Sequence, residues 1–85
     1  MKNVEIYTGP LCAFCDRAKA LLNKKGVSFK EINLASDASK MEEMIKKTNG
    51  MKTVPQIFIG GQHIGGNDKL QDLENEGKLN SLLGV

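Results

Sequence analysis

The segment that decides the fold begins with Val4-Glu5-Ile6-Tyr7-Thr8 and continues, past Gly9-Pro10, to Cys12-Ala13-Phe14-Cys15. The first five residues alternate between apolar and polar side chains, which predicts a β-strand, and Gly9-Pro10 ends it. Further along, apolar residues recur at the spacing of one helix face, at Phe14, Ala18, Leu21 and Leu22. The segment therefore predicts a strand that leads through a Cys-x-x-Cys pair into a helix.

The next residues complete a β-α-β unit. Lys24-Lys25-Gly26 is typical of a helix C-terminus, where cations suit the negative end of the dipole and glycine forms the cap. Val27 to Asn33 predicts a second strand, and the helical crossover implies that the two strands are parallel. A second helix is predicted to begin within Ser36-Asp37-Ala38-Ser39 and to carry one apolar face, made of Met41, Met44, Ile45 and Thr48.

The C-terminal half predicts a hairpin and a third helix. Gly60-Gly61 separates two β-like runs, which are Gln56 to Ile59 and Gln62 to Ile64. Asn67 or Asp68 is the predicted cap of a helix that continues to Gly77, and a last short helical turn is predicted from Leu79, Leu82 and Leu83. The expected order is β-α-β-α-β-β-α, an α/β fold in which helices flank one four-stranded mixed sheet.

Length and composition exclude several classes of protein. The 85 residues predict a single domain, residues 1–85, which excludes separate cofactor and substrate lobes. Two cysteines cannot build a disulfide-rich scaffold, and the apolar runs are too short to cross a membrane. A net charge of +2 is too small to argue for nucleic acid binding. The N-terminal residues lack a signal-peptide core, so we expect a cytoplasmic protein.

The two cysteines occupy a chemically special position. Unpaired N–H groups and the positive dipole end at a helix N-terminus stabilise a thiolate, so Cys12 is the predicted nucleophile. Cys15, inside the first turn, is the predicted resolving thiol. One alternative is an inert disulfide, which a reducing compartment disfavours. Another is a zinc site, for which His63 and carboxylates would have to complete the ligands. We predict redox chemistry and no bound metal.

Two further motifs could bind a ligand beside Cys12. Pro55 cannot donate to a strand ladder, and the backbone of Val54 before it could pair with an extended substrate. Gly65-Gly66-Asn67-Asp68 brings N–H groups to a helix start, where they could bind a carboxylate while Asp68 accepts from an ammonium group. Each motif also has an ordinary structural interpretation, namely a proline at the start of a strand and a helix cap.

Taken in order, Cys12-Ala13-Phe14-Cys15, Thr53-Val54-Pro55 and Gly65-Gly66-Asn67-Asp68 resemble the glutaredoxin family, close to its short bacterial dithiol members. The resemblance extends from Val4 to about Leu83. It implies a thioredoxin fold and glutathione-dependent reduction of protein disulfides and glutathione mixed disulfides. We therefore expect a monomer that uses glutathione as co-substrate and acts on disulfide-containing or glutathionylated proteins.

The same resemblance implies roles for individual residues. Cys12 attacks and becomes glutathionylated, and Cys15 resolves mixed disulfides with proteins. Pro55 is expected to follow a cis peptide bond. The expected glutathione-binding residues are Thr53, Val54 and Pro55 for the peptide backbone and Gly66, Asn67 and Asp68 for the γ-glutamyl end.

The chain departs from the family pattern at three places. Ala13-Phe14 stands where relatives commonly carry proline and tyrosine, and Asn67 stands where cysteine is frequent. Gly9 lies in a stretch where many relatives place a lysine for the glycyl carboxylate of glutathione. The candidates to replace that cation are Lys52 and the lysines near the end of the second helix.

These departures leave alternative functions open. Loss of the proline between the cysteines suggests a glutathione-ligated [2Fe-2S] carrier, in which Cys12 of each of two subunits holds the cluster. A redoxin reduced by thioredoxin reductase is a second alternative. A thioredoxin itself is less consistent, because the chain has no Trp before its cysteines. A peptide-binding module without chemistry would leave both cysteines unexplained.

Overall fold

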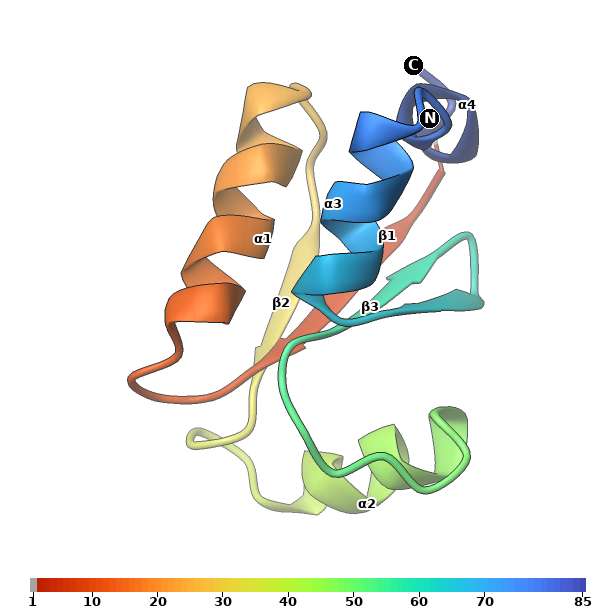
Figure 1. Cartoon of the computed structure of the whole chain (residues 1–85). Coiled ribbons are helices and arrows are strands. Elements are labelled where there is room, and N and C mark those ends of the chain that lie inside the picture. Colours follow the sequence, from red (N-terminus) through yellow and green to blue (C-terminus); the bar gives the residue numbers. More distant parts are fainter. Residues whose placement is uncertain (1) are drawn as a thin grey trace.

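A computed structural model describes residues 2–85, and Figure 1 shows the arrangement of their strands and helices. The elements are β1 (Val4–Thr8), α1 (Ala13–Lys24), β2 (Lys30–Asn33), α2 (Ser39–Lys47), β3 (Gln56–Ile59), β4 (Gln62–Gly65), α3 (Asn67–Asn75) and α4 (Leu79–Leu83). The strands form one mixed sheet in the spatial order β2-β1-β3-β4. The predicted α/β fold and order of elements are confirmed, and α4 is the predicted last helical turn.

The strand β1 pairs on both of its edges. It is parallel to β2, with Tyr7 opposite Ile32, as the crossover through α1 predicts. It is antiparallel to β3, with Ile6 opposite Ile57, and β3 is antiparallel to β4. The connecting Gly60-Gly61 has φ of 60° and 81°, the positive values that a type I′ turn requires. The predicted hairpin is therefore confirmed.

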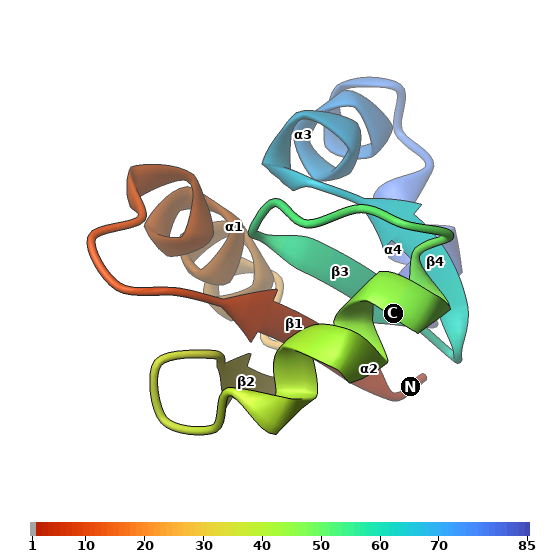
Figure 2. The ribbon, with the colours of Figure 1, turned by 90° about the horizontal axis from the view of Figure 1, so that it is seen from below.

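Side chains alternate across the sheet and build two apolar cores. The helices α1 and α3 lie on one face of the sheet and α2 lies on the other (Figure 2). Ile6 and Ile57 belong to the core that α1, α3 and α4 cover. Tyr7, Phe58 and Met44 belong to the core beneath α2. Because neighbouring residues of a strand point to opposite faces, the pairing register decides which helices each side chain contacts.

The buried face of α1 differs from the predicted one by one side chain. Ala18, Leu21 and Leu22 are buried as predicted, but Phe14 is 57% exposed and Cys15 is 1% exposed. Cys15, Ala18 and Leu22 are spaced i, i+3 and i+7, so they share the stripe that faces the sheet. Phe14 is rotated about 100° from Cys15 around the helix axis. The prediction that Phe14 shares the apolar face is wrong.

The second strand is shorter than predicted because the end of α1 uses the residues before it. Gly26 has φ of 71°, and the N–H groups of Gly26 and Val27 donate to the carbonyls of Asn23 and Leu22 at 3.0 and 3.2 Å. This pair of bonds is the Schellman arrangement of a helix C-terminus. Val27 is buried, but its N–H is already used in this cap, so the strand does not begin there, and β2 starts at Lys30.

The start of α2 lies within the predicted capping segment. Ala38 occupies the N-cap position and has no polar side chain to offer. The carboxylate of Asp37 takes over this role, because it accepts from the hydroxyl of Ser39 at 2.6 Å and from its N–H at 3.0 Å. These two hydrogen bonds hold the pKa of Asp37 below its usual range.

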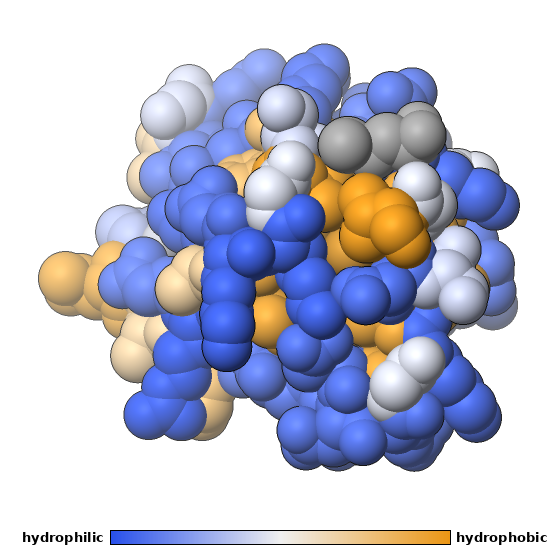
Figure 3. Space-filling model, turned by 90° about the horizontal axis from the view of Figure 1, so that it is seen from above, coloured by the Kyte–Doolittle hydropathy of each residue, from blue (hydrophilic) through white to orange (hydrophobic). Residues whose placement is uncertain are grey.

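The beginning of β1 and the last helix meet at one end of the molecule (Figure 1). The N–H of Lys2 donates to the carbonyl of Leu83 at 3.0 Å, which ties α4 to the sheet. Seen from this end, hydrophilic side chains surround apolar ones (Figure 3). Within residues 2–85, every helix is too short or too polar to span a membrane.

Replacing Gly26 with alanine is expected to destabilise the fold by about 1 kcal/mol, because alanine is strained at positive φ. An added Cβ would meet none of the described atoms within 4 Å, so the cost comes from the backbone. Gly26→Asn is the control, since asparagine tolerates this conformation better. Thermal unfolding should show a Tm lower by roughly 4–8 °C for Gly26→Ala and a smaller decrease for Gly26→Asn. Equal Tm values for the glycine and alanine proteins would contradict the assignment.

Candidate active site

Cys12 begins α1, and its side chain caps the helix. It is the N-cap residue, with extended backbone angles, and its Sγ accepts the N–H of Cys15 at 3.1 Å. The first turn of a helix has N–H groups without carbonyl partners, and the helix dipole is positive at this end. Both features favour negative charge on the sulfur of Cys12, which is the condition for a reactive thiolate.

The two cysteines differ in exposure. They are joined by a disulfide with their Cα atoms 5.2 Å apart. Cys15 is 1% exposed, whereas Cys12 is half-buried. Cys12 is therefore the cysteine that a reactant from solvent meets first, because Cys15 is buried. The Sγ of Cys12 lies 3.9 Å from the carbonyl oxygen of Val54, which places the loop before β3 beside the accessible sulfur.

A groove of about 450 Å³ lies between this loop and the start of α3. It is lined by all six predicted glutathione-binding residues, which are Thr53, Val54, Pro55, Gly66, Asn67 and Asp68. The groove is also lined by three residues outside the predicted set, which are Phe14, Met51 and Gln56. The Val54–Pro55 peptide bond is cis, as the resemblance implies. The fold therefore brings two segments that are distant in the sequence to one groove.

The helix α3 begins at this groove without a side-chain cap. Gly66 is its N-cap residue, and within residues 2–85 no side chain caps it. The prediction that Asn67 or Asp68 caps the helix is wrong, because Asn67 is the first helical residue and its Oδ1 accepts from Gln71 at 3.1 Å. An added Cβ at Gly66 would lie 3.4 Å from the carbonyl of Pro55, so the two segments are in contact. The N–H groups of the first turn are left for a ligand.

Gln56 orients the hydroxyl of Thr53. Its side chain is 1% exposed, and its Nε2 donates to the carbonyl and the Oγ1 of Thr53 at 3.1 and 3.2 Å. The carbonyl oxygen of Thr53 can only accept, so Gln56 directs its amide N–H group toward Thr53. The amide oxygen of Gln56 then faces His63, whose Nε2 lies 2.7 Å away and donates. Because the hydroxyl of Thr53 accepts from Gln56, its own proton can be donated into the groove.

The position of Gln56 in the sequence is itself informative. It is the one polar residue of β3, a strand whose four residues are all buried. A buried amide needs hydrogen-bond partners, and this requirement could have identified the residue. His63 lies on the edge strand β4, as predicted, and its ring packs against Phe58 with centroids 5.0 Å apart. Phe58 and Gln56, both on β3, therefore both contact His63.

The end of β1 is fixed just before the cysteine loop. The hydroxyl of Thr8 donates to the carboxylate of Glu31 at 2.7 Å, and Lys19 of α1 donates to the same oxygen at 3.1 Å. The hydrogen bond from Thr8, together with that from Lys19, holds the pKa of Glu31 below its usual range. The carboxylate thus joins β1, β2 and α1 at the point where the chain turns toward Cys12.

Lys47, at the end of α2, is engaged beneath the sheet. Its Nζ donates to the hydroxyl of Tyr7 at 3.1 Å and to Glu5 at 3.3 Å, and it lies 4.6 Å from the ring centre of Phe58. Burial alone would lower the pKa of Lys47, but these hydrogen bonds raise it. Burial and a hydrogen bond to Glu43 raise the pKa of Tyr7. Lys47 is therefore a poor substitute for the cation missing at position 9, whereas Lys52 is exposed beside the groove residue Thr53.

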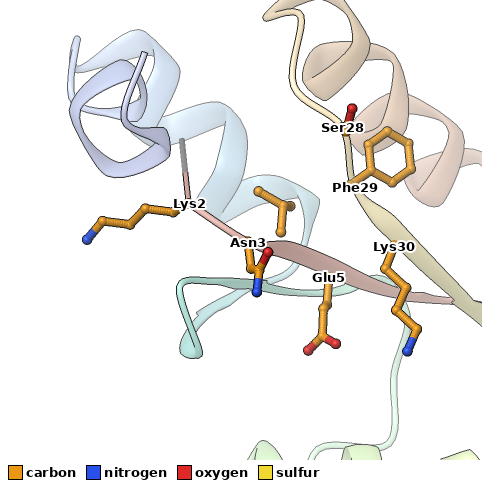
Figure 4. A pocket seen from close by; sticks show the side chains of 7 residues that line it. Lys2, Asn3, Glu5, Ser28, Phe29 and Lys30 are labelled. Atoms are coloured by element: carbon orange, nitrogen blue, oxygen red, sulfur yellow. The ribbon is translucent and has the colours of Figure 1, made fainter.

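A second hollow of about 450 Å³ lies at the other end of β1, between the first residues of β1 and β2. Figure 4 shows that the side chains of Lys2 and Lys30 extend from it in different directions. Its lining contains neither cysteine. In the part of the chain from residue 2 to 85, no three His, Cys, Asp or Glu side chains lie where they could hold a metal ion together. The groove beside Cys12 is therefore the better candidate site.

The structure resembles solved glutaredoxins. A crystal structure of a buckwheat glutaredoxin–glutathione complex matches with a TM-score of 0.86 and 32% identity, over 98% of this chain and 77% of the other. The solution structure of glutaredoxin from Brucella melitensis matches with a TM-score of 0.84 and 52% identity, over 98% and 89%. The chain therefore has the thioredoxin fold, and its Cys-x-x-Cys pair places it in the class of thiol–disulfide oxidoreductases.

Sequence comparison narrows this class to one family. The family model described as Glutaredoxin matches residues 4–64. Glutaredoxin 3 of Escherichia coli (strain K12) is 58% identical over 83 residues, which are 98% of this chain and 99% of the relative. Glutaredoxin 1 of Rickettsia conorii is 46% identical over 84 residues, 98% and 82%. The chain belongs to the glutaredoxin family and is a glutathione-dependent thiol–disulfide oxidoreductase, as the resemblance implies.

Replacing Gln56 with glutamate is expected to raise the KM for glutathione about tenfold with little change in kcat. The new carboxylate would repel the carbonyl oxygen of Thr53. It would also accept the hydroxyl proton of Thr53, which would then no longer point into the groove. Such a loss corresponds to roughly 1.4 kcal/mol, the scale of one hydrogen bond involving a charged group. Gln62→Glu is the matched control, because Gln62 is exposed on the same hairpin. A coupled assay with glutathione reductase measures both constants, and equal KM values for the two variants would refute the role of Gln56.

Proposed function

We propose that Cys12 is the nucleophile and Cys15 the resolving thiol of this oxidoreductase. The Cys12 thiolate attacks one sulfur of a substrate disulfide, and the other sulfur leaves as a thiolate. The Cys15 thiolate then attacks the Cys12 sulfur, so the substrate is released with two electrons and Cys12–Cys15 becomes oxidised. Two molecules of glutathione return the pair to the dithiol and leave as glutathione disulfide.

The observation that carries this assignment is the position of the Cys12 sulfur. It accepts an N–H at the start of α1, where the helix favours an anion, and it belongs to the more exposed of the two cysteines. Cys15 is buried one helical turn away, within reach of Cys12 but not of a bulky substrate. This difference supports one attacking sulfur and one that reacts within the molecule.

Glutathione is proposed to bind in the groove of Thr53, Val54, Pro55, Gly66, Asn67 and Asp68. Its cysteinyl backbone would pair with Val54, whose carbonyl is 3.9 Å from the Cys12 sulfur. Its γ-glutamyl carboxylate would accept from the uncapped N–H groups of α3, and its ammonium group would donate to the carboxylate of Asp68. The buckwheat relative in complex with glutathione supports this proposal.

The domain organisation, oligomeric state, cellular compartment and protein partners are also proposals. We expect one catalytic domain, residues 1–85, that acts as a monomer in the cytoplasm, where glutathione keeps thiols reduced. Its partners would be disulfide-containing or glutathionylated proteins. The [2Fe-2S] alternative, in which each of two subunits contributes Cys12, stays a prediction from the sequence. Membership of the glutaredoxin family favours reduction by glutathione over both alternatives, which are the [2Fe-2S] carrier and the redoxin reduced by thioredoxin reductase.

Substituting each cysteine separately tests their roles. Cys12→Ser is expected to abolish turnover of a glutathione mixed disulfide, a loss of at least about 10³-fold, because the nucleophile is gone. Cys15→Ser is expected to retain that activity, since a second glutathione can release the first. The same coupled assay with glutathione reductase measures both proteins. Activity that survives in Cys12→Ser would overturn the mechanism.

A change of charge at the start of α3 tests the proposed γ-glutamyl site. Asp68→Asn is expected to raise the KM for glutathione roughly fivefold, because the ammonium group loses a charged acceptor worth about 1 kcal/mol. Asp72→Asn is the control, because it makes the same change at another exposed position of α3. Steady-state kinetics at varied glutathione measure the effect. The same KM in both variants would argue against this orientation of the ligand.

A further inference from the structure

His63 begins a chain of hydrogen bonds that reaches the groove beside Cys12. It is half-buried on β4, the outer strand next to β3 (Figure 2). Its Nε2 lies 2.7 Å from the amide oxygen of Gln56, and Gln56 donates to the hydroxyl of Thr53 at 3.2 Å. Gln56 and Thr53 line the groove, whereas His63 does not. A residue outside the groove is thus connected to it through two hydrogen bonds.

The carbonyl oxygen of Thr53 sets the direction of this chain. The amide nitrogen of Gln56 has two N–H groups, which donate to the carbonyl and to the hydroxyl oxygen of Thr53 at 3.1 and 3.2 Å. In the flipped orientation, the amide oxygen of Gln56 would face the carbonyl oxygen of Thr53 with no proton between them. The amide oxygen therefore faces His63, and the proton between these two side chains belongs to Nε2 of His63.

Every group in the chain donates toward the groove. His63 donates to Gln56, Gln56 donates to Thr53, and the proton of the Thr53 hydroxyl is left for an acceptor in the groove. Hydrogen bonds that are aligned in one direction polarise and strengthen one another. Glutathione supplies suitable acceptors in its carbonyl and carboxylate oxygens. The chain therefore favours this class of ligand at Thr53.

The orientation of Gln56 depends on a donor at position 63. Gln56 is 1% exposed, and among residues 2–85 every buried side-chain nitrogen or oxygen has a hydrogen-bond partner. Without the N–H of His63, the amide oxygen of Gln56 would be buried and unpaired. The cost of such a group is comparable to the gain from the hydrogen bonds that the amide makes with Thr53. Gln56 would then turn away, and the hydroxyl of Thr53 would lose its fixed direction.

We propose that His63 is a positioning residue for glutathione binding, which donates from Nε2 to Gln56 and so keeps the Thr53 hydroxyl as a donor in the groove. This inference rests on the proposed binding of glutathione by Thr53 and adds a residue outside the groove that sets the affinity. His63 moves no proton during the reaction, because the amide of Gln56 only orients its two neighbours.

Two substitutions separate the hydrogen bond of His63 from its packing against Phe58. His63→Phe keeps an aromatic ring but has no N–H, whereas His63→Gln loses the ring but keeps a donor. His63→Phe is expected to raise the KM for glutathione about fivefold, the effect of losing one hydrogen bond, with kcat changed by less than about twofold. His63→Gln is expected to keep the KM within about twofold of the wild type. The coupled assay with glutathione reductase and bis(2-hydroxyethyl) disulfide measures both constants.

A second pair of variants tests whether the effect passes through Thr53. Thr53→Val removes the hydroxyl and is expected to raise the KM by itself. Because residues of one hydrogen-bond network are not additive, His63→Phe is expected to raise the KM by less than about twofold when it is added to Thr53→Val. Gln62→Phe is the matched control, since it places the same ring at the neighbouring exposed position of β4, and it is expected to keep the wild-type KM.

The wild-type protein allows a test that does not depend on how well the variants fold. His63 is the only histidine in the sequence, so nitrogen-15 NMR of the untagged protein shows one imidazole ring. In the neutral ring, the proton is expected on Nε2, because Gln56 offers only an acceptor. A proton on Nδ1 instead would overturn the proposal.

The kinetic outcomes are distinguishable. The proposal is wrong if His63→Phe keeps the wild-type KM, if His63→Gln raises it as much as His63→Phe, or if Gln62→Phe raises it equally. A full fivefold effect of His63→Phe in Thr53→Val would also overturn it, because the effect would then bypass the hydroxyl. A wild-type KM in Thr53→Val would overturn the proposed contact of glutathione with Thr53. Failure of the wild type to reduce the small disulfide with glutathione would instead overturn the proposed function.

Discussion

The proposed chemistry of this protein depends on one hydrogen bond, from the N–H of Cys15 to the sulfur of Cys12 at 3.1 Å. It makes the cysteine side chain the cap of α1, so the sulfur lies where the helix has unpaired donors and a positive dipole end. The same geometry buries Cys15 one turn away. The two cysteines therefore differ in exposure, because Cys12 is half-buried and Cys15 is buried.

The sheet supplies the other half of the site. Through its antiparallel pairing with β1, β3 carries the Thr53-Val54-Pro55 segment to the side of Cys12. The hairpin and β4 then return the chain so that α3 begins in contact with Pro55. Gln56 donates to the hydroxyl of Thr53 and so orients it. The carboxylate of Glu31 accepts from Thr8 and so fixes the end of β1. The groove is formed where these rigid elements end, which keeps its polar atoms in place.

Much of the fold could be predicted because local rules and tertiary structure agree. Alternation predicted β1, the double glycine predicted the hairpin, and Gly26 predicted the end of α1. Prediction failed where a residue had two acceptable roles. Val27 suits a strand but completes the cap of α1, and Asn67 suits a helix cap but lies inside α3. Periodicity alone could not distinguish Phe14 from Cys15 as the inward residue of the first turn.

The sequence by itself determined the class of fold, the reactive pair and the family, because spacing and residue type suffice to define a helix start, a hairpin and a set of motifs. The tertiary structure alone decided that Cys15 is buried, that Thr53 and Asp68 line one groove, and that Lys47 is engaged with Tyr7. These properties depend on distances between segments far apart in the chain, and only packing sets those distances.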